Sequence, residues 1–398
     1  MLSAIPIHHP ASRKTTVLPE GRTQHVNHSR TSTRHEGAPV GTAIVVGGSL
    51  AGLLTSLTLA RTGFEVTVLE RHGPAPRTGG ALQIADGLIE RVTGWNSRPG
   101  APTIPYSLPG GGQAWTTIHA GLLDACTHEE RITLLHGTRV AAAGQNDDHA
   151  WVSTTGGSTV TADLVVGADG HRSVVRRAVV PEHPDATFAG YLIWLGMVDE
   201  PELPERLRGD RRFDGGAFLG DDQDVMFGYV MPGRAGARRD GHRQIGWAWY
   251  DGTHNDFLRA NGNVRGNTVH HSVTAADIPE HLYDELADMV RSRWPSPWRD
   301  LMLFCIARRG VTGTPIAEYV PTVLTDGRLV IVGDAAHVHT PMTGQGFAAA
   351  LSDAEALADA LHDLPIAEAL RIYENARLRM SQRLALSGQN FSRSFAST

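Results

Sequence analysis

The chain has 398 residues, 41% hydrophobic and 20% charged, with a formal net charge of −6 at pH 7. This composition is typical of a soluble globular protein and lacks the basic excess of nucleic-acid-binding proteins, so we expect no nucleic-acid partner. Cys126 and Cys305 lie far apart without a CxxC partner, which argues against a disulfide framework and against a metal site. No apolar run approaches the roughly 20 residues of a membrane span, and we expect a cytoplasmic protein.

The first 39 residues are rich in Ser, Thr, His and Arg and poor in large apolar residues. Such a segment buries too little apolar surface to offset the entropy lost on ordering, so we expect a disordered extension. An Arg- and Ser-rich, acid-poor leader can also be a transit peptide, but the unstructured extension is the preferred interpretation.

The organised sequence opens with a predicted βαβ unit. Residues 43–46 form a short apolar run that ends in glycines, which is typical of a buried parallel strand. Residues 50–62 repeat apolar side chains at helical spacing and stop at Gly63, a helix C-terminal signal. Residues 65–70 alternate as a second strand, which completes the unit.

In the rest of the chain, the predicted elements change from mixed helices and strands to an antiparallel sheet and then back. A helix is predicted at 120–126, and further strands are predicted at 132–135, 151–155 and 160–166. Between 187 and 250, three β-type runs separated by Gly, Asp and Pro predict an antiparallel sheet: YLIWLGMV, VMFGYVM and QIGWAWY. A helix at 278–293, a buried strand at 329–332, a helix at 347–361 and an amphipathic helix from 366 follow. The predicted plan is a parallel-sheet unit interrupted by an antiparallel sheet.

The turn after the first strand reads Gly47-Gly48-Ser49-Leu50-Ala51-Gly52. Gly47 permits a tight turn and Gly52 permits close packing of helix on strand, so that a pyrophosphate can rest on the helix N-terminus. Ser49 replaces the middle glycine of GxGxxG, but it is small enough for close backbone approach. Glu70 follows Gly52 by eighteen positions, where an acidic residue binds ribose hydroxyls and disfavours a 2′-phosphate. The alternative for Glu70 is a solvated charge at a strand end.

Two later segments each pair a buried strand with a Gly-Asp turn: DLVVGADGHRSVVR at 163–176 and GRLVIVGDAAHVHTPMTGQGFAAALSDA at 327–354. Together with GGSLAG and Glu70, they resemble the three flavin-contacting motifs of the aromatic-ring hydroxylases, the single-component (group A) flavoprotein monooxygenases. The resemblance covers residues 43 to about 361. It implies an α/β fold in which a Rossmann-like FAD-binding domain with a parallel sheet is interleaved with an antiparallel-sheet substrate domain and followed by a C-terminal helix.

The resemblance also places boundaries and roles. The FAD-binding domain is expected at 40–183 and 302–365, the substrate domain at 184–301 and the C-terminal helix at 366–398, after the extension at 1–39. Asp334 would bind the ribityl chain, and Pro341 would lie against the isoalloxazine. The residues expected to bind FAD are Gly47, Gly48, Ser49, Leu50, Ala51, Gly52, Glu70, Arg71, Val140, Asp169, Gly170, Gly333, Asp334, Pro341, Gly344, Gln345 and Gly346.

Some positions depart from the family pattern or refine it. Ala348 stands where the family often has Asn, and His119 or Ala120 stands near a helix Arg of the family. The segments GGSLAGL, IGWAWY and HHSVTAADIPEHLYDEL are similar to the 2,6-dihydroxypyridine 3-hydroxylase branch. His337 and His339 flank the third motif, but they are not expected to bind a metal.

The resemblance implies an enzyme that uses NADH or NADPH and O2 to hydroxylate a small aromatic or heteroaromatic substrate through a flavin C4a-hydroperoxide. The nicotinamide nucleotide would bind transiently, and the protein would be a monomer or a homodimer. An epoxidase or other tailoring flavoenzyme acting on a larger intermediate is the main alternative. A halogenase is disfavoured because Trp247-Ala248-Trp249 lacks the WxWxIP pattern, and a non-enzymatic flavin-binding regulator is a further alternative.

The substrate pocket is expected along the middle sheet. In residues 244–250, Trp247 and Trp249 share one face, and Gly246 and Ala248 share the other. Because buried tryptophans usually belong to the core, core packing is the competing interpretation. The sequence does not single out a catalytic base. The substrate-binding candidates are Tyr191, Met226, Gly228, Trp247 and Trp249, and Trp194 and Tyr229 are comparable to them.

Overall fold

The computed structural model describes residues 40–73, 80–82, 84, 87–94, 112–220, 224–233, 236–341 and 344–396. The described residues all belong to one compact unit, 39–398, and the disorder predicted for 1–39 concerns residues outside the described ranges. Within those ranges, no helix combines the length and the apolar character needed to cross a membrane.

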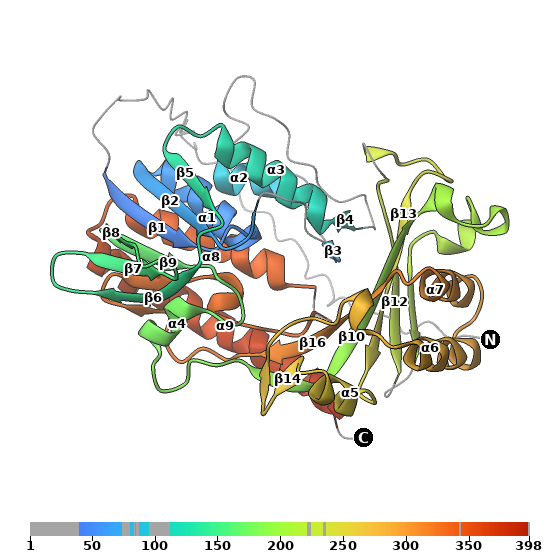
Figure 1. Cartoon of the computed structure of the whole chain (residues 1–398). Helices are drawn as coiled ribbons and strands as arrows, with labels where there is room; N and C mark the ends of the chain where they lie inside the picture. Colours follow the sequence, from blue (N-terminus) through green and yellow to red (C-terminus); the bar gives the residue numbers. More distant parts are fainter. Residues whose placement is uncertain are drawn as a thin grey trace, which may run out of the picture. The chain divides into compact units, whose positions relative to one another are not determined.

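A six-stranded sheet carries the predicted βαβ unit (Figure 1). Its order is β17-β18-β9-β1-β2-β5, and every neighbouring pair is parallel except β17 with β18. The strands are β1 (Gly41–Val46), β2 (Phe64–Glu70), β5 (Ile132–His136), β9 (Leu164–Gly167), β17 (Thr325–Asp326) and β18 (Leu329–Ile331). Helix α1 (Leu50–Arg61) connects β1 to β2, which confirms the predicted unit.

Helices and two small sheets surround this sheet. Helix α1 contacts α2 (Leu88–Thr93), α3 (Trp115–Thr127) and α8 (Gly346–Leu361). Helix α3 is the helix predicted at 120–126, and it begins five residues earlier than expected. A three-stranded sheet packs on β1 and β9, and β3 pairs with β4 near α3. These short strands are β3 (Ala81–Leu82), β4 (Gln113–Ala114), β6 (Val140–Gln145), β7 (Ala150–Thr154) and β8 (Thr159–Ala162), and α4 (Val174–Val179) packs on β6.

The predicted antiparallel sheet has five strands in the order β11-β12-β13-β10-β16. They are β10 (Thr187–Asp199), β11 (Ala217–Gly220), β12 (Val225–Met231), β13 (Gln244–Asp251) and β16 (Val311–Glu318). The boundary expected at residue 302 is too early, because it cuts α7 (Trp298–Ala307) and leaves β16 outside its own sheet. Gly313 and Pro315 weaken the strand pattern of β16, which is why the sequence did not reveal it.

The two faces of this sheet are packed differently. Helices α6 (Glu280–Arg293) and α7 cover one face of the sheet (Figure 1). On this helix-covered face, Trp194, Trp247 and Trp249 pack with side chains of the two helices in one buried cluster. On the opposite side, which we call the open face, Tyr191 and Tyr250 are buried, while Leu195, Phe227 and Ala248 are only partly buried. The alternation of a β-strand separates these two sets of side chains.

The C-terminal helix α9 (Ile366–Ala396) contacts both sheets. The Tyr373 hydroxyl donates to the Ile331 carbonyl of β18 at 3.0 Å, and the Ser392 hydroxyl donates to the Glu318 carboxylate of β16. The remaining elements are α5 (Asn255–Ala260), β14 (Val264–Arg265), β15 (Thr268–Val269) and the short 3-10 turns Glu200–Glu202, Glu205–Leu207, Arg211–Phe213, Ala275–Asp277 and Gly333–Ala335.

Candidate active site

The turn between β1 and α1 has the geometry of a phosphate-binding loop. Gly47 has φ +106°, and a Cβ there would lie 2.4 Å from the Ala168 carbonyl oxygen. A Cβ on Gly52 would lie 1.8 Å from the Gly47 carbonyl oxygen. Both glycines are therefore required for this path. Ser49 is the N-cap of α1, and its side chain makes no capping hydrogen bond. Leu50 and Ala51 begin the helix, whose N-terminal dipole favours an anion.

Glu70 lies at the end of β2 and is 5% exposed, so it is not the solvated strand-end charge of the alternative interpretation. Its Oε2 accepts a hydrogen bond from the Gly48 N–H at 2.7 Å. Its Oε1 accepts from the His72 N–H at 2.8 Å and lies 3.0 Å from His72 Nδ1. The protein thus holds the carboxylate against the turn, where ribose hydroxyls would lie. Arg71, which lies between Glu70 and His72 in the sequence, is exposed.

Helix α3 reaches the same turn through His119, one of the two positions, with Ala120, near which the resemblance places a helix arginine. His119 Nε2 lies 2.9 Å from the Gly48 carbonyl oxygen, and the imidazole stacks on Trp115 with 4.7 Å between ring centroids. A carbonyl only accepts, so Nε2 carries the proton in this contact. The departure from the family pattern therefore keeps a hydrogen-bond donor at the turn.

In the middle motif, the Asp169 carboxylate caps α4. It accepts from the Ser173 hydroxyl at 2.5 Å and from the Val174 N–H at 2.6 Å. Burial raises the pKa of Asp169 despite these bonds. Gly170 has φ +79°, which favours glycine. Val140, the other predicted residue of this half, is the buried first residue of β6.

Arg176 connects the middle motif to the third motif, and sequence reasoning did not single it out. Its fully buried guanidinium donates to the Ala335 carbonyl at 2.9 Å and to the Pro184 carbonyl at 2.6 Å. It also lies 4.2 Å from the centroid of the Tyr319 ring. A buried arginine needs such acceptors. Its position directly after the apolar pair Val174-Val175 was the only sequence signal that it could be buried.

The third motif combines a buried polar cluster with an accessible surface. Asp353 of α8 accepts from the Gly333 N–H at 2.9 Å, from His337 Nε2 at 2.7 Å and from Arg377 Nε at 2.8 Å. Burial tends to raise the pKa of Asp353, but His337 and Arg377 outweigh it, and the pKa is lowered. The cluster fixes Gly333 next to Asp334.

The predicted flavin-contacting side of this motif is accessible. The Asp334 side chain is exposed, yet burial raises its pKa, so protein surrounds a carboxyl group that solvent still reaches. Pro341, Gly344 and Gln345 are exposed, and Gln345 and Gly346 begin α8. This is the arrangement expected at the floor of a cofactor site. Ala348 is also exposed, on the first turn of α8.

The structure separates the predicted substrate residues. Met226, Trp247 and Trp249 belong to the buried cluster of the helix-covered face, and a Cβ on Gly228 would lie 2.2 Å from the Trp298 ring. Packing against α6 and α7 therefore favours the core interpretation for these four residues. Of the five substrate-binding candidates, only Tyr191 points to the open face; its hydroxyl lies 2.6 Å from Thr340 Oγ1, and burial raises its pKa to about 12.

Two segments join the open face to the nucleotide half. Thr340, the partner of Tyr191, directly precedes Pro341. At the other end, the Gly112 N–H donates to the Val230 carbonyl at 3.4 Å, and α3 follows with His119. The open face therefore lies on the same side as the first and third motifs, and the helix-covered face is turned away.

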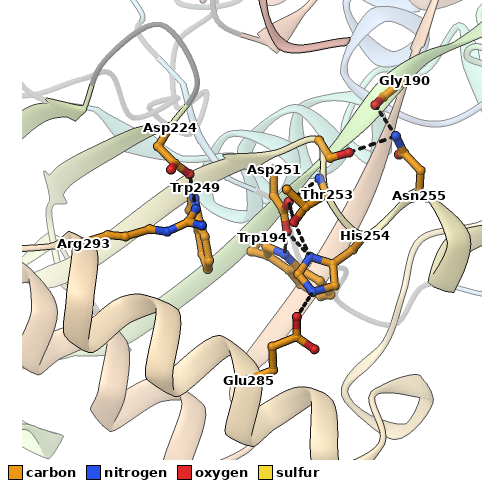
Figure 2. A network of polar contacts seen from close by, with 11 residues as sticks. Gly190, Trp194, Asp224, Trp249, Asp251, Thr253, His254, Asn255, Glu285 and Arg293 are labelled. Atoms are coloured by element: carbon orange, nitrogen blue, oxygen red, sulfur yellow. Dashed lines mark hydrogen bonds and ion pairs between the residues drawn. The ribbon is translucent and has the colours of Figure 1, made fainter. Parts of the chain in front are cut away.

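A polar network on the helix-covered face has the composition of a catalytic dyad (Figure 2). Asp251 accepts from Trp194 Nε1 at 2.7 Å and from the Thr253 N–H at 2.7 Å, and it contacts His254 Nδ1. His254 Nε2 lies 3.5 Å from a Glu285 carboxylate oxygen of α6. The network joins α5 and α6 to β10 and β13, on the side away from the motifs, and we interpret it as structural.

The residues present fit FAD. The glycine turn, the held carboxylate of Glu70 and the accessible Asp334 match a pyrophosphate, a ribose and a ribityl chain. Both ring nitrogens of buried His339 and Nε2 of His171 have no hydrogen-bond partner among the residues that the structure describes. Within the described ranges, no group of three or more His, Cys, Asp or Glu side chains is arranged to hold a metal ion.

Comparison with known proteins identifies the family. The family model described as FAD binding domain matches residues 116–386, which is more than half of the chain. The chain belongs to the FAD binding domain family. A second model, described as NAD(P)-binding Rossmann-like domain, matches residues 45–84 around the glycine turn. The expected cofactor, FAD, and the expected flavoprotein family are thereby confirmed.

Curated relatives match most of the chain. A 2,6-dihydroxypyridine 3-monooxygenase of Paenarthrobacter nicotinovorans is 26% identical over 80% of this chain and 83% of its own. A 3-hydroxybenzoate 6-hydroxylase of Klebsiella oxytoca is 24% identical over 89% of both chains. An Aurachin C monooxygenase/isomerase of Stigmatella aurantiaca is 27% identical over 85% of both chains. All three names support the expected enzyme class, an FAD-dependent monooxygenase.

Solved structures support the fold. The 2,6-dihydroxypyridine-3-hydroxylase of Arthrobacter nicotinovorans superposes with a TM-score of 0.73 at 23% identity, covering 90% of this chain and 94% of its own. Klebsiella pneumoniae HpxO complexed with FAD and uric acid gives a TM-score of 0.62 at 20% identity, covering 88% and 87%. The predicted α/β class with an antiparallel sheet is confirmed.

Proposed function

We propose that this protein hydroxylates a small aromatic or heteroaromatic compound, phenol-like or hydroxypyridine-like, using FAD, NADH or NADPH, and O2. One observation carries the proposal: the 2.6 Å contact between Tyr191 and Thr340 joins the third motif to an apolar sheet face. The same fold thus holds a cofactor site beside a surface suited to an aromatic ring. The hydroxypyridine and hydroxybenzoate names of two relatives support this substrate class.

The residues that would hold FAD are those of the three motifs. Ser49 and the N–H groups that begin α1 would meet the pyrophosphate, and Glu70 would accept from the adenosine ribose. Asp334 would accept from the ribityl hydroxyls, with Asp169 and Gly170 nearby in the middle motif. Pro341 and the residues 344–346 would meet the isoalloxazine.

When bound, FAD would supply the redox chemistry, which is hydride acceptance from the reduced nicotinamide and activation of O2. The chain's own groups provide the surroundings for this chemistry. The N-terminus of α8, at Gln345 and Gly346, presents a positive dipole end that stabilises negative charge on a reduced ring. The open face would orient the substrate ring and exclude water from it. The described residues contain one βαβ nucleotide unit, so we propose a transient nicotinamide site in a groove.

The domain boundaries follow from the sheets. We propose an FAD-binding domain at 40–183 and 319–365, a substrate domain at 184–318 and the C-terminal helix thereafter. We further propose that the enzyme works in the cytoplasm and is a monomer or a homodimer. A larger biosynthetic intermediate is the second candidate, since Phe218 extends the open face outward and is 62% exposed. The Aurachin C relative is consistent with that candidate.

The proposal is tested with the FAD-loaded protein. NADH and NADPH oxidation is measured across phenols, hydroxypyridines and larger polycyclic phenols, and the product mass is recorded. We expect one compound to accelerate oxidation and to gain one oxygen atom. Oxidation that no compound accelerates, with all electrons recovered as hydrogen peroxide, would contradict the proposed reaction.

A further inference from the structure

The centre of the open face is an apolar patch of five side chains, which we call the central patch: Leu195, Phe227, Tyr229, Ala248 and Tyr250. Leu195, Ala248 and Phe227 lie opposite one another on β10, β13 and β12. Four of the five belong to or pack on one apolar cluster, and Tyr229 lies beside them on β12. None of the five carries a charge.

The aromatic rings of this patch continue beyond it to Phe218 on one side and Tyr191 on the other. The Phe227 ring meets the Phe218 and Tyr250 rings at centroid distances of 4.7 and 5.7 Å, and the Tyr250 ring meets Tyr191 at 5.9 Å. Between the rings, Ala248 presents only a methyl group. A small surface bordered by aromatic edges suits a planar ring laid flat on the strands.

Tyr229 supplies the polar group of the patch. Its ring lies directly over Gly246, because a Cβ there would be 2.3 Å from Tyr229 Cε2. Its side chain is partly exposed, and its hydroxyl makes no hydrogen bond within the described residues. Burial raises the pKa of Tyr229, so the phenol stays protonated and can donate.

The charged side chains at the ends of this face include two acids, and Arg393 of α9 lies near one of them, Glu318. Asp199 ends β10 and contacts Gln244, and Glu318 ends β16 under α9, where it accepts from Ser392. Neither can pair with an anionic substrate. The central patch itself contains no cation, so a carboxylate placed on it would lose its hydration without gaining a charged partner there.

From this arrangement we propose that the central patch binds an uncharged aromatic ring and that the Tyr229 hydroxyl donates a hydrogen bond to an oxygen or nitrogen substituent of that ring. Tyr229 is then a positioning residue that sets which edge of the ring approaches the flavin. This deepens the proposed function and rests on it. The names of two relatives give one substrate without a carboxylate, a dihydroxypyridine, and one with a carboxylate, a hydroxybenzoate. Our inference favours the hydroxypyridine-like class.

The test compares neutral and anionic rings of equal shape on the FAD-loaded protein. 3-Hydroxybenzamide is compared with 3-hydroxybenzoate, and 6-hydroxynicotinamide with 6-hydroxynicotinate, by titrating the change in flavin absorbance. We expect each amide to bind at least about tenfold more tightly than its acid, which is the discrimination of one desolvated charge. Equal or tighter binding of the acids overturns the inference, and so does a holoenzyme that binds neither member of either pair.

Tyr229→Phe tests the hydroxyl. We expect the Kd of the better amide to rise about five- to tenfold, the effect of one hydrogen bond, with unchanged FAD affinity and Tm. Tyr283→Phe is the matched control, because that hydroxyl donates to the Ala275 carbonyl at 3.1 Å, well away from the patch. An unchanged Kd in Tyr229→Phe, or an equal rise in Tyr283→Phe, contradicts the role of Tyr229.

These binding measurements are independent of turnover. If the amides bind selectively but no compound gains oxygen, the ring site stands and the monooxygenase proposal fails. If a carboxylated ring is hydroxylated efficiently, the proposed function stands and the neutral-ring assignment fails.

Discussion

The two faces of the five-stranded sheet share the same strands but are built for different purposes. On the helix-covered face, tryptophans are fully buried and Asp251 is enclosed by three donor residues (Figure 2). On the open face, Phe227 and Ala248 stay partly exposed, and the Tyr229 hydroxyl makes no hydrogen bond with the described part of the chain. The helix-covered face, whose side chains are packed and hydrogen-bonded within the protein, contributes stability. The open face keeps partly exposed side chains that a ligand can contact. Substitutions that alternate along one strand can therefore separate stability from binding.

The largest effect is expected for Asp251→Ala on the helix-covered face. It removes the acceptor of Trp194 Nε1 and the partner of His254, and leaves both polar groups buried. We expect the free energy of unfolding to fall by about 3–5 kcal/mol, as for one partner removed from a buried pair. Urea unfolding of the FAD-loaded protein measures it. Asp288→Ala, which removes an exposed pair with Arg291, is the control and should change stability by less than about 0.5 kcal/mol.

A matched glycine pair sharpens the comparison. Gly228→Ala places a Cβ 2.2 Å from the Trp298 ring, which is buried and cannot move aside, and should cost about 1–3 kcal/mol of stability. Gly246→Ala places a Cβ 2.3 Å from the Tyr229 ring, which is partly exposed and can rotate. We expect a smaller loss of stability there, with weaker binding of the amide. If Gly246→Ala is the more destabilising of the two in urea, the open face is as tightly packed as the other.

A third, smaller effect is a pH dependence of the helix-covered face. Burial lowers the pKa of His254, but Asp251 and Glu285 outweigh it and the pKa is raised above 6.5; burial raises the pKa of Asp251, but His254 and Thr253 outweigh it and the pKa falls below 3.8. The histidine contribution is complete below pH 6.5 and is lost as the pH rises through its folded-state pKa. The aspartate contribution is complete above pH 3.8 and is lost as the pH falls through its folded-state pKa.

The pair should therefore stabilise most between about pH 4 and 6.5. The difference in unfolding free energy between the wild type and His254→Gln, measured by urea unfolding from pH 4 to 9, should be greatest in that window and decline above it. A difference that is constant across the range would show that the imidazole does not titrate with folding.

The smallest stability effect is expected for Phe218→Ser at the outer edge of the open face. The ring is 62% exposed and touches Phe227 edge-on at 4.7 Å. Stability should change by about 0.5 kcal/mol or less, as for most exposed positions. Amide titration of the same variant shows whether the edge contributes to binding. A loss of more than about 1 kcal/mol in urea would place this ring in the core instead.

Local patterns predicted most of the elements. The glycine turn and Glu70 gave the βαβ unit, and helix α8 was predicted at 347–361 and found at Gly346–Leu361. The three runs of the antiparallel sheet were found as β10, β12 and β13. Strands β6, β11 and β16 and helices α2, α5 and α7 were missed, because short or Gly- and Pro-containing segments carry a weak periodic signal.

The choice of sheet face could not be predicted from the strand sequence. Alternation groups Trp247 with Trp249 and Gly246 with Ala248, but it does not say which group the helices cover. That depends on α6 and α7, which follow β13 by about thirty residues or more. Arg176 and Asp353 were overlooked as connecting residues for the same reason, since their partners at Ala335 and Arg377 are distant in sequence.

The strand order of the six-stranded sheet has a consequence for how the chain folds during synthesis. Strand β1 pairs with β9 through Ala43 and Leu164, and β9 in turn pairs with β18 through Val165 and Leu329. When β1 has just been synthesised, β18 still lies almost three hundred residues further along the chain. Such distant pairings fold slowly and leave apolar strand edges open in the meantime. This protein should therefore depend on chaperones, or on early capture of its flavin, more than its finished stability would suggest.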